Sequence, residues 1–118
     1  MLRVLTMVRL AVTLRSSARS APDLVEAFRF LMVGTRLDPG CHGCSVWSEP
    51  DASVHYLEEW KTEADMRRRV QSESFTSVLA LIESVREPPE VQFDFVSTTR
   101  GLDYIEEVRQ PHWHDPTH

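Results

Sequence analysis

The segment RVLTMVRLAVTLR, residues 3–15, alternates two sets of mainly apolar side chains. In an extended strand, one face carries Val8, Leu10, Val12 and Leu14, and the other carries Leu5, Met7 and Ala11. A strand buried on one side only has a more polar second face. The segment therefore predicts a strand in a sheet that is covered on both sides.

The rest of the chain alternates helical and extended patterns. The spacing of the apolar residues predicts, in order, a helix over about 22–36, strands over 44–48 and 54–60, two helical pieces between 62 and about 85, and a strand over 91–96. Ser20 and Thr62 are the predicted N-caps, and Met66 and Val70 are predicted to face the core. Residues 101–108 fit either a short strand or a helical turn.

The predicted order β-α-β-β-α-β is that of the ferredoxin-like fold, which belongs to the α+β class. This fold places its helices on one face of a four-stranded antiparallel sheet. Because the other face also carries apolar side chains, we expect a second subunit to cover it, and a two-fold homodimer is the simplest solution. We predict one domain over 1–108 and a loose C-terminal tail over 109–118.

Composition excludes several classes of protein. The 118 residues carry 13 basic and 18 acidic side chains, for a net charge of −5, which argues against nucleic acid as a partner. No apolar run approaches the roughly 20 residues that a membrane span needs. The two cysteines cannot form a disulfide framework, so we predict a reducing, cytoplasmic location.

Four pieces of the sequence together resemble the antibiotic biosynthesis monooxygenase family of dimeric α+β barrels. They are Asp38-Pro39-Gly40-Cys41 after the first helix, the strand Tyr56-Leu57-Glu58-Glu59-Trp60, Glu63-Ala64 at the start of the next helix, and Ser72 with Phe75 at the helical break. More loosely, the resemblance extends over about residues 7–100. It implies a homodimer whose two sheets pack back to back, with a pocket between the helices and the sheet of each subunit.

The resemblance also implies a chemistry. Some family members oxygenate quinols or polycyclic phenols with O₂, without a metal or flavin; relatives degrade haem, and others have no known reaction. Such a reaction needs a dry aromatic pocket and a group that stabilises a phenolate. We predict Phe28, Trp60 and Phe75 as the pocket wall and Arg69 and Tyr56 as the catalytic residues, with no cofactor and no metal.

The sequence departs from the family at three positions. Arg69 and Ser74 stand where many members carry histidines, and Tyr56 stands where quinol-oxidising members carry asparagine. Arginine is not a base at neutral pH, so the proton acceptor differs from the family's usual histidine. A non-catalytic dimeric binding or structural module of the same fold is therefore the alternative, and haem handling is a third, weaker reading.

Cys41-His42-Gly43-Cys44 has the spacing of a redox or metal motif. A reactive cysteine pair usually lies at a helix N-terminus, whereas this pair leads from a turn into a strand. Two cysteines and one histidine leave a zinc site one ligand short, unless His112, His114 or His118 completes it. We interpret the two cysteines as small, partly buried structural residues.

Overall fold

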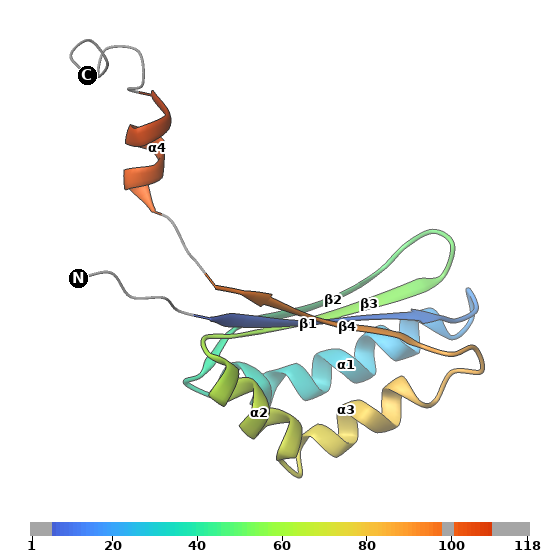
Figure 1. Ribbon diagram of the computed structural model, residues 1–118. Coiled ribbons are helices and arrows are strands. Elements are labelled where there is room, and N and C mark those ends of the chain that lie inside the picture. The colour runs from blue at the N-terminus through green and yellow to red at the C-terminus, as the bar shows by residue number, and fades with distance from the viewer. Residues whose placement is uncertain (1–5, 98–100, 110–118) are drawn as a thin grey trace, which may run out of the picture.

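Strand β1 (Met7–Arg15) lies inside a four-stranded antiparallel sheet with the order β2-β3-β1-β4. The computed structural model describes residues 6–97 and 101–109 (Figure 1). In the sheet, β3 (Ser53–Trp60) and β4 (Glu90–Val96) flank β1, and β2 (Cys41–Ser48) pairs with β3. This is the strand order of a ferredoxin-like sheet, so the predicted α+β fold is confirmed. The second strand is longer than predicted, because it begins at Cys41 and passes an irregularity between Cys41 and Gly43.

Three helices cover one face of the sheet, as Figure 1 shows: α1 (Ala21–Arg36), α2 (Glu63–Gln71) and α3 (Phe75–Ile82). The predicted break between the second and third helices is present at residues 72–74. The chain between 101 and 108 proves to be helical, as part of α4 (Leu102–Arg109), which lies away from the sheet in Figure 1. Residues 110–118 of the predicted tail lie outside the described residues.

The core lies between the sheet and these three helices. Of the two predicted faces of β1, the one with Val8, Leu10, Val12 and Leu14 points to the helices and is buried, and Val8, Leu10 and Leu14 are fully inaccessible. Phe28 of α1 and Val78 of α3 close over them and are also fully buried. Each side chain of this size contributes roughly 1.5–3 kcal/mol when it leaves water. The apolar alternation of β1 is thus matched by an apolar stripe on α1 and on α3.

The two predicted N-caps behave differently. Thr62 has extended backbone angles, and its Oγ1 accepts a hydrogen bond from the Asp65 N–H at 3.0 Å, as an N-cap does. Ser20 occupies the N-cap position of α1, but its backbone is already helical, at φ −88° and ψ −25°. Its side chain makes no cap hydrogen bond, and the prediction for Ser20 is wrong in that respect. Instead, the Oγ of Ser17 accepts from the Ser20 N–H at 3.1 Å.

The face of the sheet opposite the helices is mixed in polarity. Arg9 pairs there with Glu59 at 2.8 Å, and Thr13 hydrogen-bonds to His55. A larger exposed apolar surface lies on the edge strand β4, whose Val91, Phe93 and Phe95 are 40–57% exposed. These three side chains share the helix-side face, because they pair across β1 with Val12, Leu10 and Val8. In the described part of the chain, no helix is both long and apolar enough to cross a membrane.

Candidate active site

Glu58 is an acidic side chain buried at the centre of the fold. It points inward from β3, between Tyr56 and Trp60, and none of its surface is exposed. The Tyr56 hydroxyl donates to Oε2 of Glu58, and the Trp60 indole Nε1–H donates to Oε1 at 2.9 Å. Burying a charged carboxylate costs much free energy, and hydrogen bonds from two neutral donors offset only part of that cost. The remaining compensation comes from a cation on α2.

That cation is Arg69, whose side chain is 6% exposed. Its Nε–H donates to Oε1 of Glu58 at 3.1 Å, and its Nη2–H donates to Oε2 at 2.8 Å, which makes a bidentate pair. Nη2 also donates to Oγ1 of Thr35 at 3.1 Å, and Nη1 donates to Oγ of Ser74 at 3.0 Å. These bonds use four of the five guanidinium N–H groups. The second N–H of Nη1 makes no further hydrogen bond to the residues that the structure describes.

The direction of Arg69 overturns one sequence prediction. Met66 faces the core as predicted, at 4% exposure, but Val70 is 40% exposed. Arg69 takes the inward position instead, because it lies three residues after Met66 and the buried charge of Glu58 needs a partner. Arg67 and Arg68, its neighbours in the arginine run, are exposed. The ion pair with Glu58, rather than the apolar spacing of α2, therefore determines which side of this helix faces the core.

The five residues predicted for the site form one connected cluster. The rings of Phe28 and Tyr56 stack at a centroid distance of 4.5 Å. The guanidinium carbon of Arg69 lies 5.9 Å from the Trp60 ring centroid and 5.2 Å from that of Phe75. Distances of this size allow cation–π attraction. The cluster is therefore held together by ring contacts as well as by the Glu58 carboxylate.

Neither predicted catalytic residue is a base in this setting. Burial, and next the negative charge of Glu58, raise the pKa of Tyr56 well above its ordinary range. Burial alone lowers the pKa of Arg69, but the hydrogen bonds and charge of Glu58 outweigh it, and the net shift is upward. Tyr56 thus stays a neutral donor and Arg69 a cation. Their chemistry is limited to hydrogen bonding and charge.

A cavity of about 400 Å³ lies beside this cluster. That volume falls within the roughly 300–1,000 Å³ of small-molecule sites. Of the five predicted residues, Trp60 and Arg69 line it, whereas Phe28, Tyr56 and Phe75 do not. Its other walls are Leu31, Gly34, Thr35, Asp38, Arg68, Ser72, Ser74 and Ser77. Leu31 and the small accessible part of Trp60, which is 1% exposed, form the apolar wall for a small ring, and several hydroxyl groups can bond to its polar atoms.

Sequence reasoning missed Glu58 as a member of the site. The signal was present, because an acid stands in the middle of the inward face of the strand formed by Val54, Tyr56 and Trp60. Such an acid needs a buried cation, and the arginine run on the next helix offers one. Thr35 gave no comparable signal, and Asp38 and Ser74 were singled out only through the family resemblance, since serine, threonine and aspartate are common in turns and helix ends.

The cysteines do not form a metal or disulfide site in the described residues. Cys41 and Cys44 are both free thiols of intermediate exposure. Burial, and next the charge of Cys44, raise the pKa of Cys41 to about 11, and burial also raises that of Cys44. No group of three or more potential metal ligands occurs within 6–97 and 101–109. His112, His114 and His118 lie outside these ranges.

The sequence matches a known protein family. The family model described as "Antibiotic biosynthesis monooxygenase" matches residues 7–81. No curated protein matches the sequence. That family match takes in β1 to most of α3 and so includes the whole Glu58 cluster.

Solved structures share the fold at low sequence identity. A protein from Nitrosomonas europaea, provisionally assigned as an antibiotic biosynthesis monooxygenase, is 15% identical with a TM-score of 0.67, over 80% of this chain and 94% of its own. One from Caulobacter crescentus CB15, with the same provisional assignment, is 14% identical with a TM-score of 0.66, over 81% and 92%. A Bacteroides thetaiotaomicron VPI-5482 protein of unknown function, described as a possible oxidoreductase, is 16% identical with a TM-score of 0.64, over 79% and 98%. The family match spans more than half of the sequence, and this chain belongs to the antibiotic biosynthesis monooxygenase family.

Proposed function

We propose that the protein is a monooxygenase that oxidises a small aromatic or quinol-like molecule with O₂ and without a metal or flavin cofactor. The observation that carries the proposal is the cavity of about 400 Å³ beside Trp60 and Arg69. Membership of the family supports the reaction class. In this proposal the substrate's ring lies against Trp60 and Leu31, and its hydroxyl oxygen accepts the remaining Nη1–H of Arg69.

The electrons in such a reaction come from the substrate. Oxidation of a ring methylene to a carbonyl releases four electrons, and O₂ takes up four, placing one oxygen atom in the product and the other in water. The protein's part is to bind the ring, exclude water and stabilise the phenolate that reduces O₂. Because Glu58 balances the charge of Arg69, the site offers a fixed N–H dipole rather than an uncompensated cation.

The substrate's proton needs an acceptor, and the cavity walls limit the choice. Of the residues that line this cavity, only Asp38 carries a carboxylate. Its Oδ1 accepts the Gly40 N–H at 2.8 Å and lies 3.4 Å from Nη2 of Arg68. Asp38 is partly exposed, so a proton that it takes up can pass to solvent. We therefore propose Asp38 as the first proton acceptor.

Oxygen uptake tests this function. The purified protein is mixed with a panel of hydroquinones and anthrones, and O₂ consumption is followed with an electrode. We expect uptake above buffer for at least one compound, reduced about a hundredfold in Asp38→Asn, in line with the loss of a general base. Glu63→Gln, at the first residue of α2 and outside the cavity, is the matched control and is expected to match wild type. No uptake over buffer for any compound argues against the proposal.

We further propose that the protein acts as a homodimer. Two exposed apolar surfaces support this: the β4 side chains Val91, Phe93 and Phe95, and the α4 side chains Leu102, Ile105 and Val108, which are 52–76% exposed. Apolar area that leaves water stabilises an assembly by about 25 cal/mol per Å², before the costs of association. In sedimentation at micromolar concentration, we expect a species of twice the 13.6 kDa chain mass.

A variant locates that interface. Phe95→Asp puts a charge on the exposed β4 surface and is expected to shift the protein to the monomer. Phe30→Asp is the control, since Phe30 is 80% exposed on α1, on the outer side of the helix layer. A wild-type protein that sediments as a single chain at micromolar concentration contradicts the dimer.

One observation favours a second function, that of a non-catalytic binding or structural module. Among the described residues, every buried side-chain nitrogen or oxygen has a hydrogen-bond partner, including those of Glu58 and Tyr56. A site whose polar groups satisfy one another is also what a structural core needs. If this reading holds, ring compounds bind in the cavity beside Trp60 without consuming O₂, and calorimetry with a hydroquinone under argon separates binding from turnover.

A further inference from the structure

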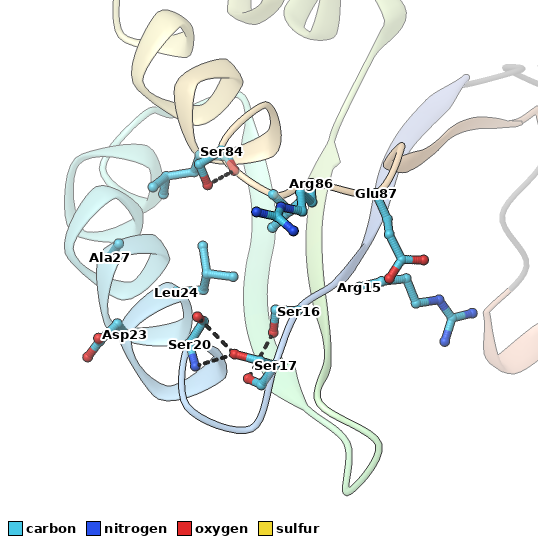
Figure 2. A pocket seen from close by; sticks show the side chains of 12 residues that line it. Arg15, Ser16, Ser17, Ser20, Asp23, Leu24, Ala27, Ser84, Arg86 and Glu87 are labelled. Carbon is cyan, nitrogen blue, oxygen red and sulfur yellow. Dashed lines mark hydrogen bonds between the residues drawn. The ribbon is translucent and has the colours of Figure 1, made fainter.

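A second cavity, of about 730 Å³, lies at the opposite end of α1 from the candidate active site. It shares no lining residue with the cavity beside Trp60. Its walls come from the end of β1, the turn into α1, the first two turns of α1, the end of α3 and the turn that follows α3 (Figure 2). It is therefore a separate space, built by parts of the chain that the proposed reaction does not use.

The floor of this cavity is apolar. Leu24 of α1 is 9% exposed, and Leu81 and Val85 are partly buried against the same core. Ala27 adds a small side chain to the lining. An apolar ring or short chain of a ligand can lose its water here at about 25 cal/mol per Å².

One cation is directed into the space above this floor. Figure 2 shows the side chain of Arg86 extending toward Leu24, while that of Arg15 turns away. Arg15 lies 3.5 Å from Asp51 and 3.6 Å from Glu90, so its charge is already matched. Arg86 has no hydrogen bond or ion pair with any residue within 6–97 or 101–109.

The acids that line the cavity do not neutralise Arg86. In Figure 2 the carboxylate of Asp23 points to the outer side of α1, and that of Glu87 points toward Arg15. Arg86 and Glu87 are exposed, so the cavity opens to solvent beside the guanidinium. A ligand can therefore reach Arg86 without breaking an existing ion pair.

A second donor lies on the opposite wall. The Ser17 hydroxyl donates to Oγ of Ser20 at 3.0 Å and accepts the Ser20 N–H at 3.1 Å. The hydroxyl protons of Ser16 and Ser84 are used by the carbonyls of Ala52 and Leu81. The Ser20 hydroxyl proton has no acceptor in the described part of the chain, and it is available to a ligand.

We propose that this cavity binds a small organic acid. The apolar body of the acid packs on Leu24, Ala27 and Leu81, and its carboxylate accepts from the Arg86 guanidinium, with the Ser20 hydroxyl as a further donor. A single unmatched guanidinium suits a monoanionic carboxylate, with which it forms a bidentate pair. A phosphate dianion needs more positive charge than this cavity holds, and it has no apolar body for the floor.

An NMR titration with 1-naphthoate tests the proposal, with 1-naphthamide as the uncharged analogue. We expect naphthoate to shift the amide signals of residues 17–27 and 84–87 and to bind about tenfold or more tightly than the amide, since a charge-assisted hydrogen bond is lost. Inorganic phosphate is expected to cause no saturable shifts there. Equal affinity for acid and amide, or shifts confined to the surroundings of Trp60, overturns the proposal.

Two variants separate the charge from the apolar floor. Arg86→Gln is expected to remove the preference for the acid, while Arg29→Gln, an exposed arginine of α1 outside the cavity, is expected to keep it. Ala27→Trp fills the space and is expected to abolish binding of both compounds. Unchanged naphthoate binding in folded Arg86→Gln or Ala27→Trp, checked by circular dichroism, contradicts the site. O₂ uptake by Arg86→Gln is expected to match wild type, so this test is independent of the proposed reaction.

Discussion

The guanidinium of Arg69 meets the carboxylate of Glu58 in the interior, with Nη2 and Oε2 2.8 Å apart and both side chains at most 6% exposed. They lie eleven positions apart in the chain, in the consecutive elements β3 and α2. The contact joins β3 to α2 and orients Tyr56 and Trp60 through the same carboxylate. It therefore couples the packing of the fold to the geometry of the candidate site.

Removing the buried charge of Glu58 tests this coupling. Glu58→Gln leaves Arg69 as an unmatched buried cation, which is expected to lower the free energy of unfolding by about 3–5 kcal/mol. Glu59→Gln is the matched control: it removes the next residue's pair with Arg9, which is 42% exposed, and should cost about 0–1 kcal/mol. Urea denaturation at pH 7 measures both.

A double variant separates the lost charge pair from lost packing. Combining Glu58→Gln with Arg69→Met leaves no unpaired charge, so the double variant is expected to be more stable than the single variant Glu58→Gln. Strictly additive losses in the two single variants and the double variant would show that the two charges do not stabilise one another.

The pKa of Tyr56 predicts how stability responds to alkaline pH. Because the folded pKa is raised above the ordinary value of 10.0, the unfolded chain releases this proton at lower pH than the folded chain does. The contribution of Tyr56 is therefore fully present below pH 10 and is lost as the pH rises above it. In urea titrations from pH 8 to 11.5, Tyr56→Phe is expected to lose less stability over the alkaline range than wild type. Parallel curves for the two proteins contradict the raised pKa.

The cysteines are expected to be unreactive in the folded protein. With a pKa of about 11 instead of 9.0, Cys41 has about a hundredfold smaller thiolate fraction near pH 8. The higher intrinsic nucleophilicity of a more basic thiolate offsets part of this loss. In Cys44→Ser, alkylation of Cys41 by iodoacetamide should be at least about tenfold slower in buffer than in denaturing urea. Equal rates in the two conditions point to an exposed, reactive thiol.

The strands and helices could be predicted from the sequence because each depends on a local pattern of apolar and polar residues. Alternation over residues 7–15 gave the burial of Val8, Leu10 and Leu14, and the polar break at 72–74 gave the division between α2 and α3. Both patterns arise from side-chain direction along one element. The sequence did not decide between a strand and a helix for the segment that forms α4, because so short a segment has too few positions to distinguish a period of 2 from one of 3.6 residues.

The candidate site could be predicted only in part, because its decisive contact, that of Glu58 with Arg69, joins two different elements. Val70 lies four residues after Met66 and matches the apolar period as well as any core residue, yet it is exposed. What turns Arg69 inward is Glu58 on another strand, and no pattern within α2 contains that information. Ser20 failed as a cap for a local reason: its backbone is already helical, and Oγ of Ser17, three residues earlier, accepts its N–H.

The binding of a phenolic ligand is the most direct test of the candidate site. A crystal soaked under argon with a naphthohydroquinone shows both its position and its polar contacts. We expect the ring against Trp60 in the cavity lined by Thr35 and Ser74, with one oxygen about 2.6–3.2 Å from Nη1 of Arg69. A ligand seated only in the cavity beside Arg86, or a cavity beside Trp60 that holds no ligand at saturating concentration, contradicts this expectation.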